Sequence, residues 1–433
     1  MPSPNASGLL PIFSKTLFYV RENFPEDISP RSRDLLLGAL DAVAQQDHDI
    51  LVEREPDSPP RWVTVTVGGQ PCTLDIERVD APWSLRSTLQ QAFRFLQVHF
   101  ASAPSAESEQ RLSNLELAAI NGMLSALDGR SQLLDSETYR RVRPQAGLTT
   151  SAGPRAPRAH ETSEATDADT RPGTPFVPLA APGRTIGYLR LLGFPHGVSG
   201  ELEKSLLAVE AAPPKGFILD LRDNSGGLVE EAVRVADAFI KAGTLGSIAG
   251  QRKRKEYVAH SDGHEPVGAL VVLVNRRTAG AAELVAAAVK NLGRGIVIGE
   301  PTAGAGMIEQ MFDIPRRGHR APPKDRDVVQ NILDDAPPPK LPDEWEGDLL
   351  GLYLTTGRLL AAGGAEIEHA GVQPDIEMAW PPGKNRQPDE DCVRQFAEAL
   401  IVRGSDPARS TLLATAKTLP AEGLCRSVGL RGG

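Results

Sequence analysis

In the stretch GFILDLRDNSGG, residues 216–227, an apolar run ends abruptly in a turn rich in Asp, Asn and Gly, which predicts a buried strand followed by a tight turn. Two later stretches repeat the pattern, ALVVLVNRRTAG at 269–280 and GIVIGEPTAG at 295–304. The first two runs are followed by the helix-like stretches LVEEAVRVADAFI and AAELVAAAVKN. Strands that alternate with helices in this way are typical of a layered α/β domain with a buried, largely parallel sheet. Such turns also leave backbone N–H groups at helix N-termini, where negative charge can be held.

The order and the amino-acid sequences of these turns resemble those of the tail-specific, or C-terminal-processing, serine peptidase family. LDLRDNSGG (219–227) is similar to that family's LDLRxNxGG. VNRRTAGAAE (274–283) lies where the family has a run like SASASE, whose middle Ser is the nucleophile, and GEPTAGAG (299–306) lies where it has GxxTxGKG, whose Lys is the general base. The resemblance covers 185–380 well and 112–142 fairly. It implies an α/β fold, with a layered crotonase-like ββα peptidase core preceded by a mainly helical N-terminal domain.

The catalytic side chains of the resembled family are missing from this chain. The nucleophile position is Gly280 and the lysine position is Ala305, and the family's spacing is kept (305 − 280 = 25). A Gln that follows the lysine by one helical turn in the family is Glu309 here. By resemblance, the oxyanion donors would be backbone N–H groups of the residues Gly226, Gly227 and Ala281.

A Ser–Lys peptidase needs a hydroxyl that attacks, a neutral amine that accepts its proton, and backbone donors for the oxyanion. Gly280 has no side chain and Ala305 cannot accept a proton. Loss of either member of such a unit removes most of the rate. We therefore expect a catalytically inactive homologue, a pseudopeptidase, with a peptide-binding, scaffold or regulatory role. Its partner would be a peptide or protein ligand, including an active peptidase relative.

The alternative is an active serine-type endopeptidase that acts on protein C-terminal regions through a rearranged site. Ser225 and Thr278 are the substitute nucleophiles, although a turn residue is the simpler interpretation of Ser225 and a helix N-cap that of Thr278. Thr302 reads as an ordinary turn residue, and Glu309 is expected to meet an Arg or solvent. A third hypothesis is another chemistry on the same layered fold, in which paired N–H groups hold an enolate.

Composition shifts divide the chain. Residues 1–143 read as a mainly helical domain with a small β-hairpin around Gly68-Gly69. Residues 144–182 are rich in Pro, Ala and Thr, which predicts a disordered linker in place of the family's PDZ domain. Residues 183–380 form the predicted core, with a charged, Pro-rich insertion at 315–348, and 381–433 form a helical tail.

Composition also excludes several classes. The net charge of −9 over 433 residues argues against a nucleic-acid binder, and the basic cluster at 252–255 is expected to be a solvated loop or a strand edge. The sequence contains no run of 18 or more apolar residues, so we expect no membrane-spanning helix. No signal peptide is visible either, and we therefore expect a cytoplasmic protein. The three cysteines, Cys72, Cys392 and Cys425, are predicted to be thiols, and no spacing indicates a metal or a cofactor.

Overall fold

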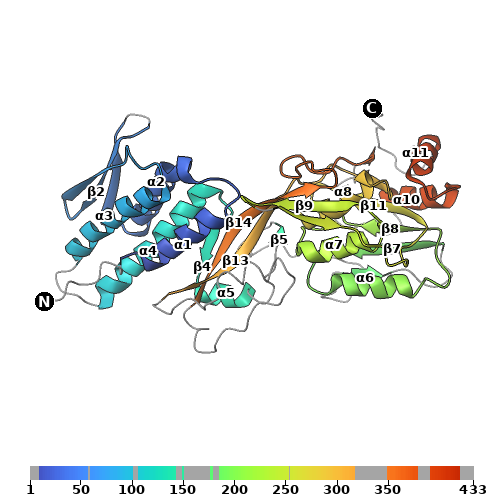
Figure 1. Ribbon diagram of the computed structural model, residues 1–433, viewed down its shortest axis with the longest axis horizontal. Coiled ribbons are helices and arrows are strands. Elements are labelled where there is room, and N and C mark those ends of the chain that lie inside the picture. The colour runs from blue at the N-terminus through green and yellow to red at the C-terminus, as the bar shows by residue number, and fades with distance from the viewer. Residues whose placement is uncertain are drawn as a thin grey trace. The chain divides into compact units, whose positions relative to one another are not determined.

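In the computed structural model the chain forms two units, which Figure 1 shows. The first comprises Met1–Ala146 and Glu309–Gly357, and the second Gly147–Ile308 and Arg358–Gly433. Strands β13 and β14 (Met307–Pro315 and Leu349–Ala361) each have residues in both units. The structure describes residues 9–56, 59–100, 106–142, 149–150, 176–178, 185–252, 254–316, 349–378 and 391–419.

Helices dominate the first unit. Their apolar stripes, such as Leu35, Leu36, Leu40 and Val43 of α2, are buried in one shared core. An open surface pocket of about 600 Å³ lies along α2 and α4, and it is lined by small and polar residues such as Asn121. The helices are α1 (Pro11–Asn23), η1 (Ser29–Arg31), α2 (Ser32–Gln46), α3 (Pro82–Phe100), α4 (Ala106–Leu127) and α5 (Ser136–Val142).

The predicted hairpin is present in this unit. Strands β2 (Trp62–Val67) and β3 (Gln70–Asp75) pair antiparallel, and β1 (Ile50–Arg54) adds a third strand on the other side of β2. Gly68 and Gly69 have φ of 56° and 77°. A two-residue hairpin turn with both φ values positive favours glycine, which explains the Gly-Gly pair.

Part of the predicted 183–380 core packs with the helices instead. Leu350, Leu352 and Leu354 alternate along β14 and join the first unit's core, as do Phe312 and Ile314 of β13. Strand β4 (Gln132–Leu134) pairs antiparallel with β14 in the same unit. An alternation with period two buries one face of a strand, so the apolar face of β14 goes to whichever core it meets. Most of the predicted insertion, 317–348, lies outside the described residues.

The second unit contains the predicted mixed α/β layer with a largely parallel sheet. The strand order is β15-β12-β11-β8-β7-β6, and all pairs are parallel except β6 with β7. Every residue of β8 and β11 is buried, as expected for strands covered on both faces. The bounds are β6 (Phe176–Pro178), β7 (Ile186–Leu191), β8 (Gly216–Asp220), β11 (Ala269–Val274), β12 (Ile296–Gly299) and β15 (Ile376–Glu377).

Helices cover this sheet. Those of the C-terminal segment, α10 (Cys392–Arg403) and α11 (Arg409–Thr418), bury Phe396, Leu400 and Leu412 against one face. Helix α8 (Ala281–Asn291) contacts β11 and β12 and also β9 (Thr244–Ala249). Helices α6 and α7 (Val198–Leu207 and Val229–Asp237) contact each other, and α7 contacts α8.

The basic cluster at 252–255 runs into β10 (Arg254–Val258), which is the terminal strand of its sheet and pairs with β9. Arg254 is exposed there. Of the two alternatives that the sequence left open, the strand edge is therefore the one observed.

The linker prediction is wrong at two places. β5 (Thr149–Thr150) and β6 are strands within 144–182, and β6 pairs with β7. A three-residue edge strand needs only backbone pairing, which average composition does not reveal. The remaining linker residues lie outside the described segments.

The prediction of three thiols is also wrong, because Cys392 is in a disulfide, while Cys72 is free. Sequence spacing cannot reveal a pairing that depends on which segments meet in space. Within the described segments, no helix has the length and hydropathy that a membrane crossing requires.

Candidate functional site

The three turns identified in the sequence come together at the carboxyl ends of the strands of the parallel sheet. β8, β11 and β12 are neighbours, so their carboxyl ends lie side by side. Backbone hydrogen bonds join the turns: the Ala279 N–H donates to Asn224 O at 2.9 Å, and the Ala303 N–H donates to Thr278 O at 2.9 Å. The sheet thus places the predicted nucleophile and lysine positions in one continuous frame.

Gly280, at the predicted nucleophile position, is the N-cap of α8 and has φ 62° and ψ −122°. These are the dihedrals of the second residue of a type II′ turn, which glycine dominates. Ala281, the first residue of the helix, is fully buried. The backbone therefore makes a sharp strand-to-helix turn at Gly280, without a side chain at its apex.

A buried carboxylate, which the sequence analysis did not single out, connects the two catalytic positions. Glu283 has no exposed surface, and its Oε2 accepts the N–H of Gly280 and the N–H of Ala305, both at 2.8 Å. Its Oε1 accepts the Gly304 N–H at 2.8 Å and the Thr302 hydroxyl. Glu283 stands three residues after the helix N-cap, which is the Glu position of a capping box and the signal that could have identified it.

Thr302 is more than the ordinary turn residue that we expected. The N–H of Val372 donates to its hydroxyl oxygen at 2.7 Å, and its own hydroxyl proton goes to Glu283. All four partners of the Glu283 carboxylate are donors, which suits the acceptor-only ionised form. The Glu283 clamp, defined as Glu283 with its four donors on residues 280, 302, 304 and 305, fixes the lysine-position turn against α8.

The turn after β8 is held by its own side chain. Asn224 donates from Nδ2 to Leu191 O at 3.0 Å and accepts the Gly226 N–H on Oδ1 at 2.9 Å. The Gly226 N–H, one of the predicted oxyanion donors, is therefore engaged in the turn. Gly227 and Ala281 also have interaction partners. The Gly226 donor is thus used within the turn in this conformation.

Comparison with known proteins decides the family. Residues 185–378 match the model of peptidase family S41. This region is an S41 peptidase domain. It is similar to the chloroplastic C-terminal processing peptidase of Tetradesmus obliquus, with 29% identity over 203 residues that make up 47% of this chain and 37% of that protein. The carboxyl-terminal-processing protease of Picosynechococcus is 33% identical over 135 residues, 31% of this chain and 32% of that one.

The alignments therefore span about a third of the length of these two relatives. Among solved structures, a photosystem II D1 C-terminal processing protease aligns with a TM-score of 0.50 and 18% identity, covering 87% of this chain and 94% of that one. At this identity the likeness concerns the fold.

Glu309 is the third residue of the S41 domain that the sequence assigned to the site. Glu309 belongs to the first unit, whereas Gly280 and Ala305 belong to the second. Glu309 is fully buried, and its Oε1 lies 3.7 Å from Nη1 of Arg130. Of the two expected partners of Glu309, an Arg or solvent, the Arg is the one observed. Arg130 stands where the resembled family has the His of a Pro-His pair.

The substitute nucleophiles have different surroundings. The Thr278 hydroxyl is buried; it accepts the Asn275 N–H at 2.9 Å and donates to Leu221 O at 2.8 Å. It is not the helix N-cap, because Gly280 is. Ser225 is exposed on its turn. Thr278 is thus committed to the backbone, and Ser225 is the hydroxyl that solvent reaches.

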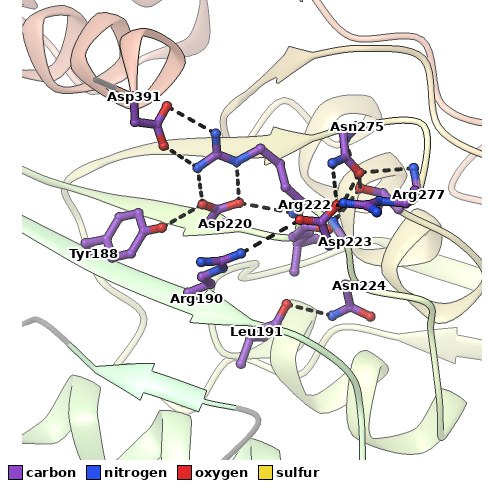
Figure 2. Close-up of polar contacts among 12 residues, drawn as sticks. Tyr188, Arg190, Leu191, Asp220, Arg222, Asp223, Asn224, Asn275, Arg277 and Asp391 are labelled. Atoms are coloured by element: carbon purple, nitrogen blue, oxygen red, sulfur yellow. Dashed lines mark hydrogen bonds and ion pairs between the residues drawn. The ribbon is translucent and has the colours of Figure 1, made fainter. Parts of the chain in front are cut away.

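A buried charged network lies beneath the turn after β8, as Figure 2 shows. Arg222 donates from Nε to Asp220 Oδ1 at 2.8 Å, and from Nη2 and Nη1 to the two oxygens of Asp391 at 2.7 and 3.1 Å. The Tyr188 hydroxyl donates to Asp220 Oδ2 at 2.6 Å. Burial alone would raise the pKa of Asp220, but the Arg222 guanidinium outweighs it and holds that pKa below its usual value. Asp391 caps α10, so this network joins the C-terminal helix to the site.

A second polar cluster in Figure 2 clasps two of the turns together. Asp223 has a left-handed backbone, φ 65°, and its N–H donates to Asn275 Oδ1 at 3.1 Å. In return, Asn275 Nδ2 donates to Asp223 Oδ1 at 2.8 Å. Asp and Asn tolerate the left-handed region better than other side chains do. The clasp fixes the turn after β8 relative to the turn after β11.

Proposed function

We propose that this chain is a non-catalytic relative of the C-terminal processing peptidases, one that binds a peptide or protein segment where the relatives cut one. The observation that carries the proposal is the pairing of Gly280 and Ala305 on the two sides of the Glu283 clamp. The frame of the site is complete, while the positions for a nucleophile and a base carry no functional group. Catalysis by this route lacks both reacting groups, so binding is the activity that remains.

Peptide binding is favoured over a purely structural role by the exposed turns at the sheet edge. Ser225, Arg276 and Arg277 on these turns are exposed, so their polar groups are accessible to a ligand. The ligand in this proposal is a peptide or an unfolded protein segment, and an active peptidase relative is one protein that could supply it. Neither nucleic acid nor a membrane is part of the proposal.

The test is incubation of the purified full chain with an unfolded protein substrate and, separately, with a serine-directed fluorophosphonate probe. We expect neither cleavage nor covalent labelling, together with saturable binding of unfolded protein measured by fluorescence anisotropy. Cleavage or labelling that disappears in Ser225→Ala would overturn the proposal and establish the rearranged peptidase instead. The exposed position of Ser225 is the observation that keeps this second function testable.

A matched comparison uses Thr278→Ala. Because the Thr278 hydroxyl is buried and hydrogen-bonded to Leu221 O and Asn275 N, its loss should lower stability without changing any labelling. Hydrolysis that is lost in Ser225→Ala but kept in Thr278→Ala identifies the exposed Ser225 hydroxyl as the nucleophile. Residual hydrolysis that survives both variants excludes both hydroxyls as the nucleophile.

A further inference from the structure

Three arginines gather beside the candidate site. Arg190 lies on β7, and Arg276 and Arg277 lie on the turn between β11 and α8. The side chains of Arg276 and Arg277 are each 78% exposed. Their acidic ion-pair partners are Asp223 and Glu300, and Arg190 also interacts with the buried Asp220.

One carboxylate of the protein already occupies part of this group. Asp223 Oδ1 accepts from Arg277 Nε at 2.8 Å and lies 2.7 Å from its Nη2, while Oδ2 lies 3.8 Å from Arg190 Nη2 (Figure 2). The carboxylate reaches this place from a left-handed backbone position, φ 65°. The arrangement is therefore complementary to a carboxylate, and an internal group holds it in the ligand-free chain.

Arg277 has capacity for a second carboxylate. A guanidinium presents five N–H groups, and those of Nε and Nη2 face Asp223. Arg276 donates from Nε to Glu300 at 3.1 Å, in an ion pair at the surface. Exposed ion pairs of this kind are worth little, so an incoming carboxylate can replace them at small cost. Arginine also recognises carboxylates with two parallel hydrogen bonds, which a lone ammonium cannot do.

We propose that Arg277, assisted by Arg276 and Arg190, binds a carboxylate of the peptide ligand, and that Asp223 competes for the same guanidinium. This inference rests on the proposed peptide-binding function. The recognised chemistry is a carboxylate, whether it is the free C-terminus of a peptide or an Asp or Glu side chain. The ligand would lie at the carboxyl ends of β7, β8 and β11, alongside the Gly280 turn.

The first experiment tests the carboxylate site without any peptide. Glutarate is titrated into the full chain, and the arginine Nε–Hε resonances are followed by nitrogen-15 NMR. The resonance of Arg277, assigned by its loss in Arg277→Ala, should shift with saturation. The apparent affinity should weaken about tenfold in Arg277→Ala, the loss expected for a charge-assisted hydrogen-bond pair. Arg403→Ala, on the exposed end of α10, is the control and should leave the affinity unchanged.

Asp223→Asn gives the sharpest result. Asn keeps an oxygen acceptor for Arg277 and tolerates the left-handed backbone, but removes the competing charge. Competition predicts several-fold tighter glutarate binding in this variant, and weaker binding at higher salt in every variant. Weaker binding in Asp223→Asn would show that Asp223 only positions Arg277, and would overturn the competition. A glutarate titration that shifts no arginine resonance would overturn the site.

The second experiment separates the sources of the carboxylate. One peptide sequence is prepared with a free C-terminus, with a C-terminal amide, and as the amide with one internal Glu. If only the peptide with a free C-terminus binds more tightly than the amide, the recognised carboxylate is the C-terminus. If the amide with an internal Glu binds more tightly, the recognised carboxylate is a side chain. Equal binding of all three in both the wild type and Arg277→Ala overturns this inference but leaves the proposed peptide binding intact. If no peptide binds, the proposed function fails, even where glutarate still shifts Arg277.

Discussion

Restoring a hydroxyl at the nucleophile position should make the protein less stable. Gly280→Ser places a Cβ on a residue with φ 62° and ψ −122°, a conformation that L-residues adopt only under strain. Such strain costs about 1–3 kcal/mol. A serine also has fewer unfolded conformations than a glycine, which offsets roughly 0.5–1 kcal/mol. The net loss should be about 1–2 kcal/mol, or a fall of about 2–8 °C in Tm for a unit of this size.

The measurement is urea unfolding of Gly280→Ser and Gly280→Ala beside a matched glycine. Gly200 lies inside α6, and a Cβ there would meet nothing within 4 Å. Gly200→Ala should therefore raise stability by about 0.5–1 kcal/mol, because alanine is the better helix former. The two glycines are thus expected to respond with opposite signs.

Activity gives a second test of the same variant. Gly280→Ser alone should remain inactive, because Ala305 supplies no base. The double variant Gly280→Ser, Ala305→Lys places both groups on the frame held by Glu283. If Gly280→Ser is as stable as the wild type, or gains stability as Gly200→Ala does, the strained-turn description of this site is wrong.

Three further predictions concern buried carboxylates. Glu283→Gln should lower the free energy of unfolding in urea by about 3 kcal/mol or more, because the amide NH₂ of Gln would face backbone donors. The control Glu203→Gln, on the exposed face of α6, should cause no measurable change. The lowered pKa of Asp220 implies stabilisation that is present above its unfolded pKa and lost as pH falls through the folded one. Asp220→Asn should therefore lose about 3–5 kcal/mol at pH 7, with a smaller difference between pH 7 and pH 3 than the wild type. Burial raises the pKa of Glu116, which accepts the N–H groups of Ile12 and Phe13, so this carboxylate disfavours folding as pH rises. Glu116→Gln should be neutral or stabilising at pH 7 and Glu116→Ala should cost about 1–2 kcal/mol, both measured by thermal unfolding.

The frame of the site was predictable because its signals are local. A continuous apolar run followed by Asn, Asp and Gly specifies a buried strand and a turn, and the structure has these strands in β8, β11 and β12. The turn chemistry of Asn224 is also local, since its side chain bonds the N–H two residues later. Short-range rules therefore predict these strands and turns, whereas the assignment of Gly280 and Ala305 to the catalytic positions came from the resemblance to the peptidase family.

The groups that hold the frame were not predictable in the same way. Asp391 binds Arg222 from 169 residues away, and Glu309 was expected to meet an Arg without any indication that this would be Arg130. Buried polar groups must find partners, but the sequence does not say which segments supply them. The same limit applies to β14, whose alternation predicts one buried face but not the core against which it packs.

The Glu283 clamp explains how an S41 domain can keep its site without its catalytic side chains. Three of the four donors to Glu283 are backbone N–H groups, on Gly280, Gly304 and Ala305, and a backbone donor survives substitution of the side chain. A Ser at 280 or a Lys at 305 therefore contributes nothing to this set of contacts, and its absence removes none of them. The contacts of Glu283 are therefore independent of the side chains at 280 and 305, because the carboxylate accepts backbone N–H groups there. The turns of such a site are ordered through backbone contacts, and a preordered site is what the proposed binding function requires.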